Sequence, residues 1–186
     1  MCKNRFCLML IVLISFMEIF VGCKYSAVIE YYNDPKQYAD IWDLSGVRDA
    51  QEEKNTIFPK NINDLEVVTF FCRYDQQHPL GEGIQILLEI KYFDAEEFQR
   101  EVDTLSQQCF CVDDYFTDLN KVFAIRFGED DGIEGENDGI EYAAINENEQ
   151  VISYVYLDDL PKEQIEIDSK FIPNGYYGYS TVKKKG

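Results

Sequence analysis

Residues 83–105 read GIQILLEIKYFDAEEFQREVDTL, and this order of a strand pattern followed at once by a helix pattern decides the fold. Apolar side chains recur at every second position from Gly83 to Tyr92, which predicts a strand with one buried face and one solvated face. The buried face comprises Ile84, Ile86, Leu88, Ile90 and Tyr92, and the solvated face comprises Gln85, Glu89 and Lys91.

The helix is expected to begin at Asp94. Asp94 followed three residues later by Glu97 has the spacing of a capping box, and Phe93 and Phe98 occupy the two positions of a hydrophobic staple. The apolar stripe of this helix consists of Phe98, Val102 and Leu105. A stripe of this kind predicts that the helix lies on the sheet.

Further elements surround this centre. Asp34-Pro35 predicts the start of a short amphipathic helix, with Tyr38, Ile41 and Trp42 on one face. Strand patterns occupy residues 67–74, 122–127, 140–146 and 151–157. In the first of these strands, Val68, Phe70, Cys72 and Tyr74 share a face. The polar link from Asn146 to Gln150 favours an antiparallel pair. We therefore expect an α+β fold, an antiparallel sheet of about five strands with one or two helices packed on one face.

The first 22 residues have the pattern of a secretory leader. Lys3 and Arg5 give a basic start, an apolar run extends from Phe6 to Met17, and the small residue Gly22 precedes Cys23. This segment resembles the type II (lipobox) signal peptide of bacterial lipoproteins, in which the cysteine is lipidated and becomes the mature N-terminus. The resemblance implies that residues 1–22 are a lipoprotein signal peptide and that Cys23 carries the lipid.

An uncleaved membrane anchor and ordinary cleavage are the alternatives to lipidation. Glu18 argues against the anchor, because an acidic side chain near the bilayer centre costs about 2.5–3.5 kcal/mol. Each version places the body of the chain outside the cell. With the acyl chains of a lipoprotein, the expected location is the extracytoplasmic face of the cell membrane.

Residues 23–186 are expected to form a single extracytoplasmic α+β domain, because a chain of this length usually builds one core. The formal net charge of −18 repels phosphate backbones and argues against nucleic acid as a partner. The 13 tyrosines and 13 phenylalanines distinguish the chain from disordered acidic proteins.

Of the six cysteines, Cys72, Cys109 and Cys111 lie beyond the leader and the lipidation position. Three thiols allow at most one internal disulfide, of Cys72 with Cys109 or Cys111, and Cys72 fits equally well as a small core side chain. A zinc site of these thiolates with His78 is a further alternative, but the Cys-x-Cys spacing is unusual for zinc fingers. The sequence leaves the pairing open.

An acidic heptapeptide is repeated in tandem, since residues 128–134 read GEDDGIE and residues 135–141 read GENDGIE. Glu134, Glu136 and Asp138 are the calcium candidates, at the first, third and fifth positions of an EF-hand-like frame. The frame is incomplete, because its twelfth position is Ile145 instead of a bidentate acid. We therefore expect a mobile acidic loop over residues 128–141 and no specific metal site.

The sequence contains no Gly-x-Ser-x-Gly elbow, no His-Glu-x-x-His motif and no phosphate-binding glycine loop. No catalytic residue and no cofactor are therefore expected. The favoured role is a membrane-tethered binding, interaction or structural module. The alternative from another class is an extracellular carboxylate-dependent or metal-dependent hydrolase, in which acids would converge with His78.

The expected partners are the membrane, through the lipid anchor, and an envelope protein or a wall polymer. Beyond Pro161 the local signals weaken, and we expect a flexible C-terminal tail that ends in the lysines 183–185. Exposed aromatic side chains are candidates for a binding surface, with packing at the sheet edge or terminal disorder as the alternatives. These candidates are Tyr31, Tyr32, Tyr176, Tyr177 and Tyr179.

The incomplete frame predicts that calcium does not bind the repeated heptapeptide specifically. Calorimetric titration of the protein with calcium up to millimolar concentration should give no saturable heat. Saturable heat that disappears in the Glu134→Gln variant would contradict this expectation.

Overall fold

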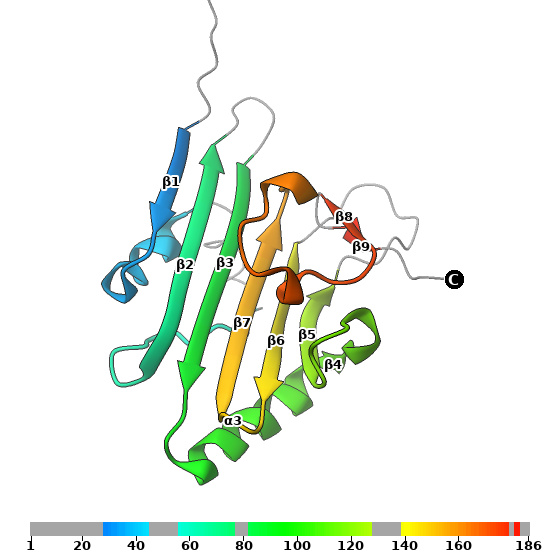
Figure 1. Cartoon of the computed structure of the whole chain (residues 1–186). Coiled ribbons are helices and arrows are strands. Elements are labelled where there is room, and N and C mark those ends of the chain that lie inside the picture. Colours follow the sequence, from blue (N-terminus) through cyan, green and yellow to red (C-terminus); the bar gives the residue numbers. More distant parts are fainter. Residues whose placement is uncertain (1–27, 45–55, 77–81, 128–138, 179–180, 183–186) are drawn as a thin grey trace, which may run out of the picture.

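Seven strands form one antiparallel sheet in the part of the chain that the computed structural model describes, residues 28–44, 56–76, 82–127, 139–178 and 181–182 (Figure 1). Their order across the sheet is β1-β2-β3-β7-β6-β5-β4, and every neighbouring pair is antiparallel. The strands are β1 Val28–Tyr32, β2 Glu66–Gln76, β3 Glu82–Lys91, β4 Phe110–Cys111, β5 Val122–Phe127, β6 Ile140–Asn146 and β7 Val151–Asp158.

The sheet consists of two meanders, β1 to β3 and β4 to β7, which are connected through helix α3, Ala95–Gln108. β3 and β7 pair at the centre, from Ile84 opposite Asp158 to Lys91 opposite Val151. An antiparallel sheet with few helices is what the sequence predicted, but the expected number of about five strands was wrong. The two additional strands lie at the edges, where β1 lacks an apolar alternation and β4 has only two residues.

Both faces of the sheet are covered, so the expectation of one solvated face was wrong. α3, the residues after Asp34 and residues 57–62 pack on one face. Residues 112–119 and the described residues between Ile165 and Val182 pack on the other. Figure 1 shows α3 behind the strands and the C-terminal segment, orange to red, in front of them. Gln85, which was expected in solvent, is 0% exposed because residues 164–167 lie over it.

The C-terminal segment corrects a second expectation, because a flexible C-terminal tail was predicted and the described residues after Pro161 pack on the sheet; residues 183–186 lie outside the described residues. Phe171 and Tyr176 are each 2% exposed. The hydroxyl of Tyr142 donates to the carbonyl of Phe171, and the hydroxyl of Tyr176 donates to the carbonyl of Leu160 at 3.0 Å. Contacts between residues far apart in the chain produce no periodic apolar pattern in the sequence of the segment, so the sequence did not predict its packing. The short elements of the segment are η4 Lys162–Gln164, η5 Ser169–Phe171, β8 Tyr176–Gly178 and β9 Thr181–Val182.

α3 begins as predicted. The Asp94 side chain accepts hydrogen bonds from the backbone amides of residues 96 and 97, at 2.7 and 3.1 Å. The buried side chains of the helix are Phe98, Val102 and Leu105. The predicted hydrophobic staple was wrong, because Phe93 is 72% exposed and the Phe98 ring lies 5.9 Å from the Tyr92 ring instead.

Two 3-10 turns replace the α-helix predicted after Asp34, η1 Pro35–Gln37 and η2 Asp40–Asp43. Asp34 caps the first turn by accepting a hydrogen bond from the amide of Lys36 at 3.0 Å. Tyr38 and Ile41 are buried, as expected. In a segment this short, the free-energy cost of nucleating an α-helix exceeds the gain from the few hydrogen bonds that an α-helix would add. The segment therefore forms 3-10 turns with i to i+3 hydrogen bonds.

A β-bulge changes the face of one predicted core residue in β2. The register with β3 shifts between Val67 and Thr69. Val68 is therefore 55% exposed, although the sequence pattern placed it in the core. The other members of the predicted face are buried as expected, namely Phe70, Cys72 and Tyr74. An added residue in one strand reverses the alternation on one side of the bulge.

Asp94→Ala should lower the midpoint of urea unfolding, because it removes the acceptor for two amides at the start of α3. Hydrogen bonds from the backbone of Glu97 and Glu96 hold the pKa of Asp94 below its ordinary value. A carboxyl whose pKa is lowered on folding stabilises the fold above its unfolded pKa of about 3.9 and loses this contribution as the pH falls below that value. The difference between wild type and variant should therefore shrink in acid.

The control is Gln107→Ala, at an exposed position of the same helix. Equal midpoints for the two variants at neutral pH would contradict the capping role of Asp94.

Candidate functional site

Several residues that the sequence singled out lie outside the described residues. They are the lipidation candidate Cys23, the calcium candidates Glu134, Glu136 and Asp138, and His78 of the hydrolase alternative. The structure therefore neither brings them together nor separates them, and the predictions about them stand as predictions.

The aromatic candidates divide into exposed and buried side chains. Tyr31 and Tyr177 are 46% and 49% exposed, and Tyr32 is partly buried. Tyr176 was expected at the surface, and this was wrong because its side chain packs in the core on the C-terminal face of the sheet. Tyr179 lies outside the described residues. The exposed members, Tyr31 and Tyr177, come from the edge strand β1 and from β8.

The three described cysteines are free thiols. β2, which carries Cys72, and β4, which carries Cys111, are separated by five strand spacings of about 4.8 Å, which is roughly 24 Å and too far for a disulfide. Burial raises the pKa of Cys72 to about 12 and, with the nearby Glu141 carboxylate, that of Cys109 to about 11. Both of these groups are therefore neutral thiols at physiological pH, and Cys72 packs as a core side chain.

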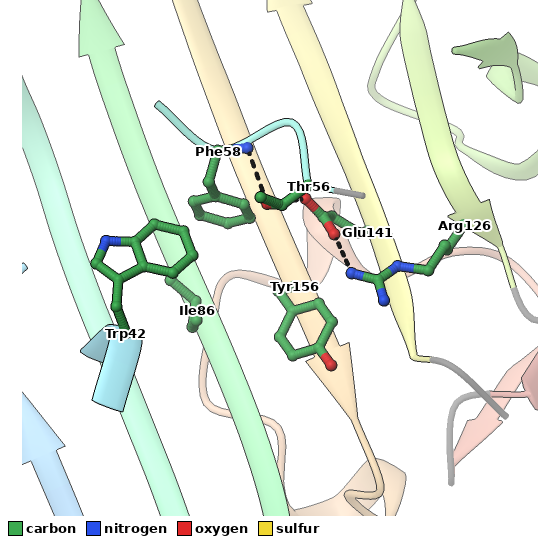
Figure 2. A pocket seen from close by; sticks show the side chains of 7 residues that line it. All are labelled: Trp42, Thr56, Phe58, Ile86, Arg126, Glu141 and Tyr156. Carbon is green, nitrogen blue, oxygen red and sulfur yellow. Dashed lines mark hydrogen bonds and ion pairs between the residues drawn. The ribbon is translucent and has the colours of Figure 1, made fainter. Parts of the chain in front are cut away.

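A buried polar cluster surrounds Glu141 on β6, on the face of the sheet that α3 covers (Figure 2). Glu141 is 1% exposed. Its Oε1 accepts hydrogen bonds from the Thr56 hydroxyl at 2.6 Å and from the Ile57 amide at 2.7 Å. Its Oε2 forms an ion pair with the Arg126 guanidinium. The carboxylate thus joins β5 and β6 to the chain segment that begins at Thr56.

The position of Glu141 corrects the predicted bounds of the acidic loop. The sequence assigned residues 128–141 to a mobile loop and residues 140–146 to a strand. The strand is confirmed and the end of the loop was wrong, because Ile140 and Glu141 belong to β6 and are 0% and 1% exposed. The alternation of β6 directs Glu141 to the same face as Ala143 and Ile145. Residues 128–138 lie outside the described residues.

Two backbone irregularities bring the groups of the cluster together. The β5–β6 register shifts between Ala124 and Arg126, which places Arg126 opposite Glu141. The Arg126 guanidinium lies 5.6 Å from the centre of the Tyr156 ring. Gly139 has φ of +78°, and a Cβ there would lie 2.9 Å from the Tyr156 ring. The second copy of the repeat therefore supplies a glycine and a glutamate that the fold requires.

The side chains labelled in Figure 2 line a cavity of about 10 Å³, room for about one water molecule. Pockets for small molecules usually measure roughly 300–1,000 Å³. Protein donors occupy both oxygens of the Glu141 carboxylate. The arrangement therefore fastens residues 56–58 to the sheet and leaves little room for a substrate.

A second buried network lies on the opposite face, around Arg73 of β2, which is 6% exposed. Its Nη2 pairs with Asp75 at 2.9 Å, and its Nη1 donates to the Gln164 carbonyl at 2.5 Å and to the Glu166 carboxylate at 2.9 Å. Gln85 donates to the same Gln164 carbonyl at 3.0 Å and accepts from the Glu166 amide at 2.7 Å. This network fastens residues 164–166 to β2 and β3.

Sequence reasoning missed both networks. The sequence feature that could have indicated them is a charged residue inside an apolar strand pattern, such as Arg126 in VFAIRF and Glu141 in IEYAAIN. A charge placed among core positions is rarely buried without a partner. That signal identifies a buried ion pair but does not name the partner.

An open cleft of about 750 Å³ lies beside the turn between β6 and β7. Lys121 crosses this cleft, because its ammonium pairs with Glu147 at 2.8 Å and lies 5.9 Å from the Phe123 ring. The other polar side chains that line it are Asp113, Asp118, Asn120, Asn146 and Asn148. Among the described residues, no three His, Cys, Asp or Glu side chains converge to hold a metal ion.

Comparisons with known proteins add no relative. No family model, no curated protein and no solved structure matches this chain. None of the helices in the described ranges is long and apolar enough to cross a membrane.

Glu141→Gln should lower the free energy of unfolding by about 3–5 kcal/mol, because it leaves the Arg126 guanidinium without its counter-ion at a mostly buried site. Arg126→Met should cost a similar amount, and the double variant should lose less than the sum of the two. Urea unfolding at constant pH measures all three.

The matched control is Glu147→Gln, which breaks the exposed pair with Lys121 and should change the stability by about 0–1 kcal/mol. If Glu141→Gln costs no more than Glu147→Gln, the Glu141 cluster does not fasten the segment after residue 56.

Proposed function

We propose that this chain is a bacterial lipoprotein, held at the extracytoplasmic face of the cell membrane by acyl chains on Cys23. The leader supports the proposal, because Lys3 and Arg5 precede an apolar run and Cys23 follows the small residue Gly22. Two or more acyl chains hold a protein firmly at a bilayer, whereas one chain binds only marginally.

The observation that carries the proposal is the short distance along the chain between Cys23 and the fold. The first described strand, β1, begins at Val28. Cleavage before Cys23 would therefore remove no described part of the sheet. Because β1 is an edge strand, the chain enters the sheet at its periphery, where a tether displaces no core residue.

For the domain itself, we propose a role in binding, in interaction with an envelope protein or wall polymer, or as a structural module. The buried carboxylates Glu141 and Asp75 are each paired with an arginine, as is the partly exposed Glu166. Groups committed in this way hold segments of chain in place, which supports a structural use of these carboxylates over a catalytic one. The net charge of −18 favours partners other than nucleic acids.

Mass spectrometry of the mature N-terminus tests the tether. We expect a peptide that begins at Cys23 and carries a diacylglycerol-sized increment, and we expect the increment to disappear in Cys23→Ala. Cys2→Ala changes a cysteine inside the leader and should leave the increment in place. Recovery of the native protein with an intact Met1 and no added mass would contradict the proposal.

A further inference from the structure

The edge strand β1 exposes an unusual number of apolar side chains. Val28 is 47% exposed, Ile29 is 42% exposed and Tyr31 is 46% exposed. β1 pairs with β2 on one side and with no described strand on the other. An edge with apolar side chains and unpaired backbone groups is a surface that proteins usually cover or charge.

The length of chain before β1 limits what can cover this surface. Val28 follows Cys23 by five positions, and an extended residue spans at most about 3.5 Å, so that the two lie within about 17 Å of each other. A lipid on Cys23 would hold the start of β1 close to the head groups of the bilayer. This step rests on the lipidation proposed above.

We propose that the β1 edge, at its Val28 and Ile29 end, lies against the surface of the bilayer. Aliphatic side chains gain free energy when they leave water for the interface, and tyrosine favours positions with one apolar and one wet side. The hydroxyl of Tyr31 is held by Glu166 at 2.9 Å, which leaves the ring edge available at the surface.

Charge bears on the source of the membrane affinity and argues against a second copy of the chain as the cover of this edge. A net charge of −18 repels anionic lipid, so the acyl chains supply the membrane affinity and the β1 side chains determine only the orientation. A second copy carries the same charge, and antiparallel pairing of two β1 strands about their centre would place Glu30 opposite Glu30.

The orientation assigns opposite roles to the two ends of the sheet. One end of the sheet holds Val28, the end of β2, the start of β3 and the start of β6. This follows because each neighbouring pair of strands from β1 to β6 is antiparallel. The turn between β6 and β7 lies at the other end (Figure 1). The open cleft lies beside this turn, since Asn146, Glu147 and Asn148 line it. The cleft therefore faces away from the bilayer, where a soluble partner reaches it.

Fluorescence quenching in vesicles tests the proposal. The full lipidated protein is reconstituted into phosphatidylcholine vesicles with and without bromine on the acyl chains, and its single tryptophan, Trp42, is replaced by phenylalanine. Ile29→Trp then reports on the β1 edge. Phe110→Trp is the control, because Phe110 is 51% exposed on β4, six strand spacings or about 29 Å away.

We expect brominated lipid to quench roughly half of the fluorescence of Ile29→Trp and little of that of Phe110→Trp, since an interfacial side chain reaches the acyl boundary. Equal quenching of the two variants, in preparations that carry the lipid mass and float with the vesicles, would overturn the orientation while the tether stands.

A preparation without the lipid mass would overturn the tether and the orientation together. If Trp42→Phe does not fold, Ile29→Trp and Phe110→Trp are each made in a chain that keeps Trp42. The quenching of each variant is then compared with that of the unsubstituted protein.

Discussion

The pairing of β3 with β7 is the constraint on which the rest of the structure depends, because it joins the β1–β3 meander to the β4–β7 meander. These central strands are buried on both sides, with Ile86 and Leu88 toward α3 and Leu87 and Val155 toward the C-terminal segment. Such a centre requires a covering layer on each face. Only part of that layer is α-helix, and the remainder is irregular chain whose backbone polar groups need partners when they are buried.

The two buried charge networks meet that requirement. On one face, the Glu141 carboxylate binds the amide of Ile57, and on the other, Arg73 and Gln85 bind the carbonyl of Gln164. An ion pair seldom repays its desolvation by Coulomb attraction alone. Here each network also bonds to the backbone of a covering segment, so its effect is to select where that segment lies on the sheet. The irregular layers are thus positioned by polar contacts and stabilised by the apolar side chains around them.

The sequence predicted the elements whose causes are local. The bounds of β5 and β6 agree with the predicted strands, and α3 begins at its cap Asp94, because alternation and capping are read within a few residues. Features set by distant partners were missed. Gln85 meets Gln164 across 79 positions and Glu141 meets Ile57 across 84. Gln85 was assigned to the solvated face and Glu141 to the end of the acidic loop, because no local pattern reveals a distant covering segment. The exposure of Val68 likewise follows from the register with β3, which the isolated pattern of β2 does not contain.

The acidic repeat shows which part of its own sequence the fold constrains. Both copies end in Gly-Ile-Glu, so the second copy supplies Gly139, Ile140 and Glu141 to the start of β6, and an insertion of seven residues before them leaves that strand unchanged. The entropy of loop closure rises slowly with length, by about 0.6 kcal/mol for each doubling, so such an insertion costs little. Phe127 and Ile140, which pair across β5 and β6, lie at the same end of the sheet as Val28. Because both copies end in the same three residues, the start of β6 and the buried Glu141 cluster are the same whether the chain carries one copy or two, so the core constrains the end of the repeat and not its length.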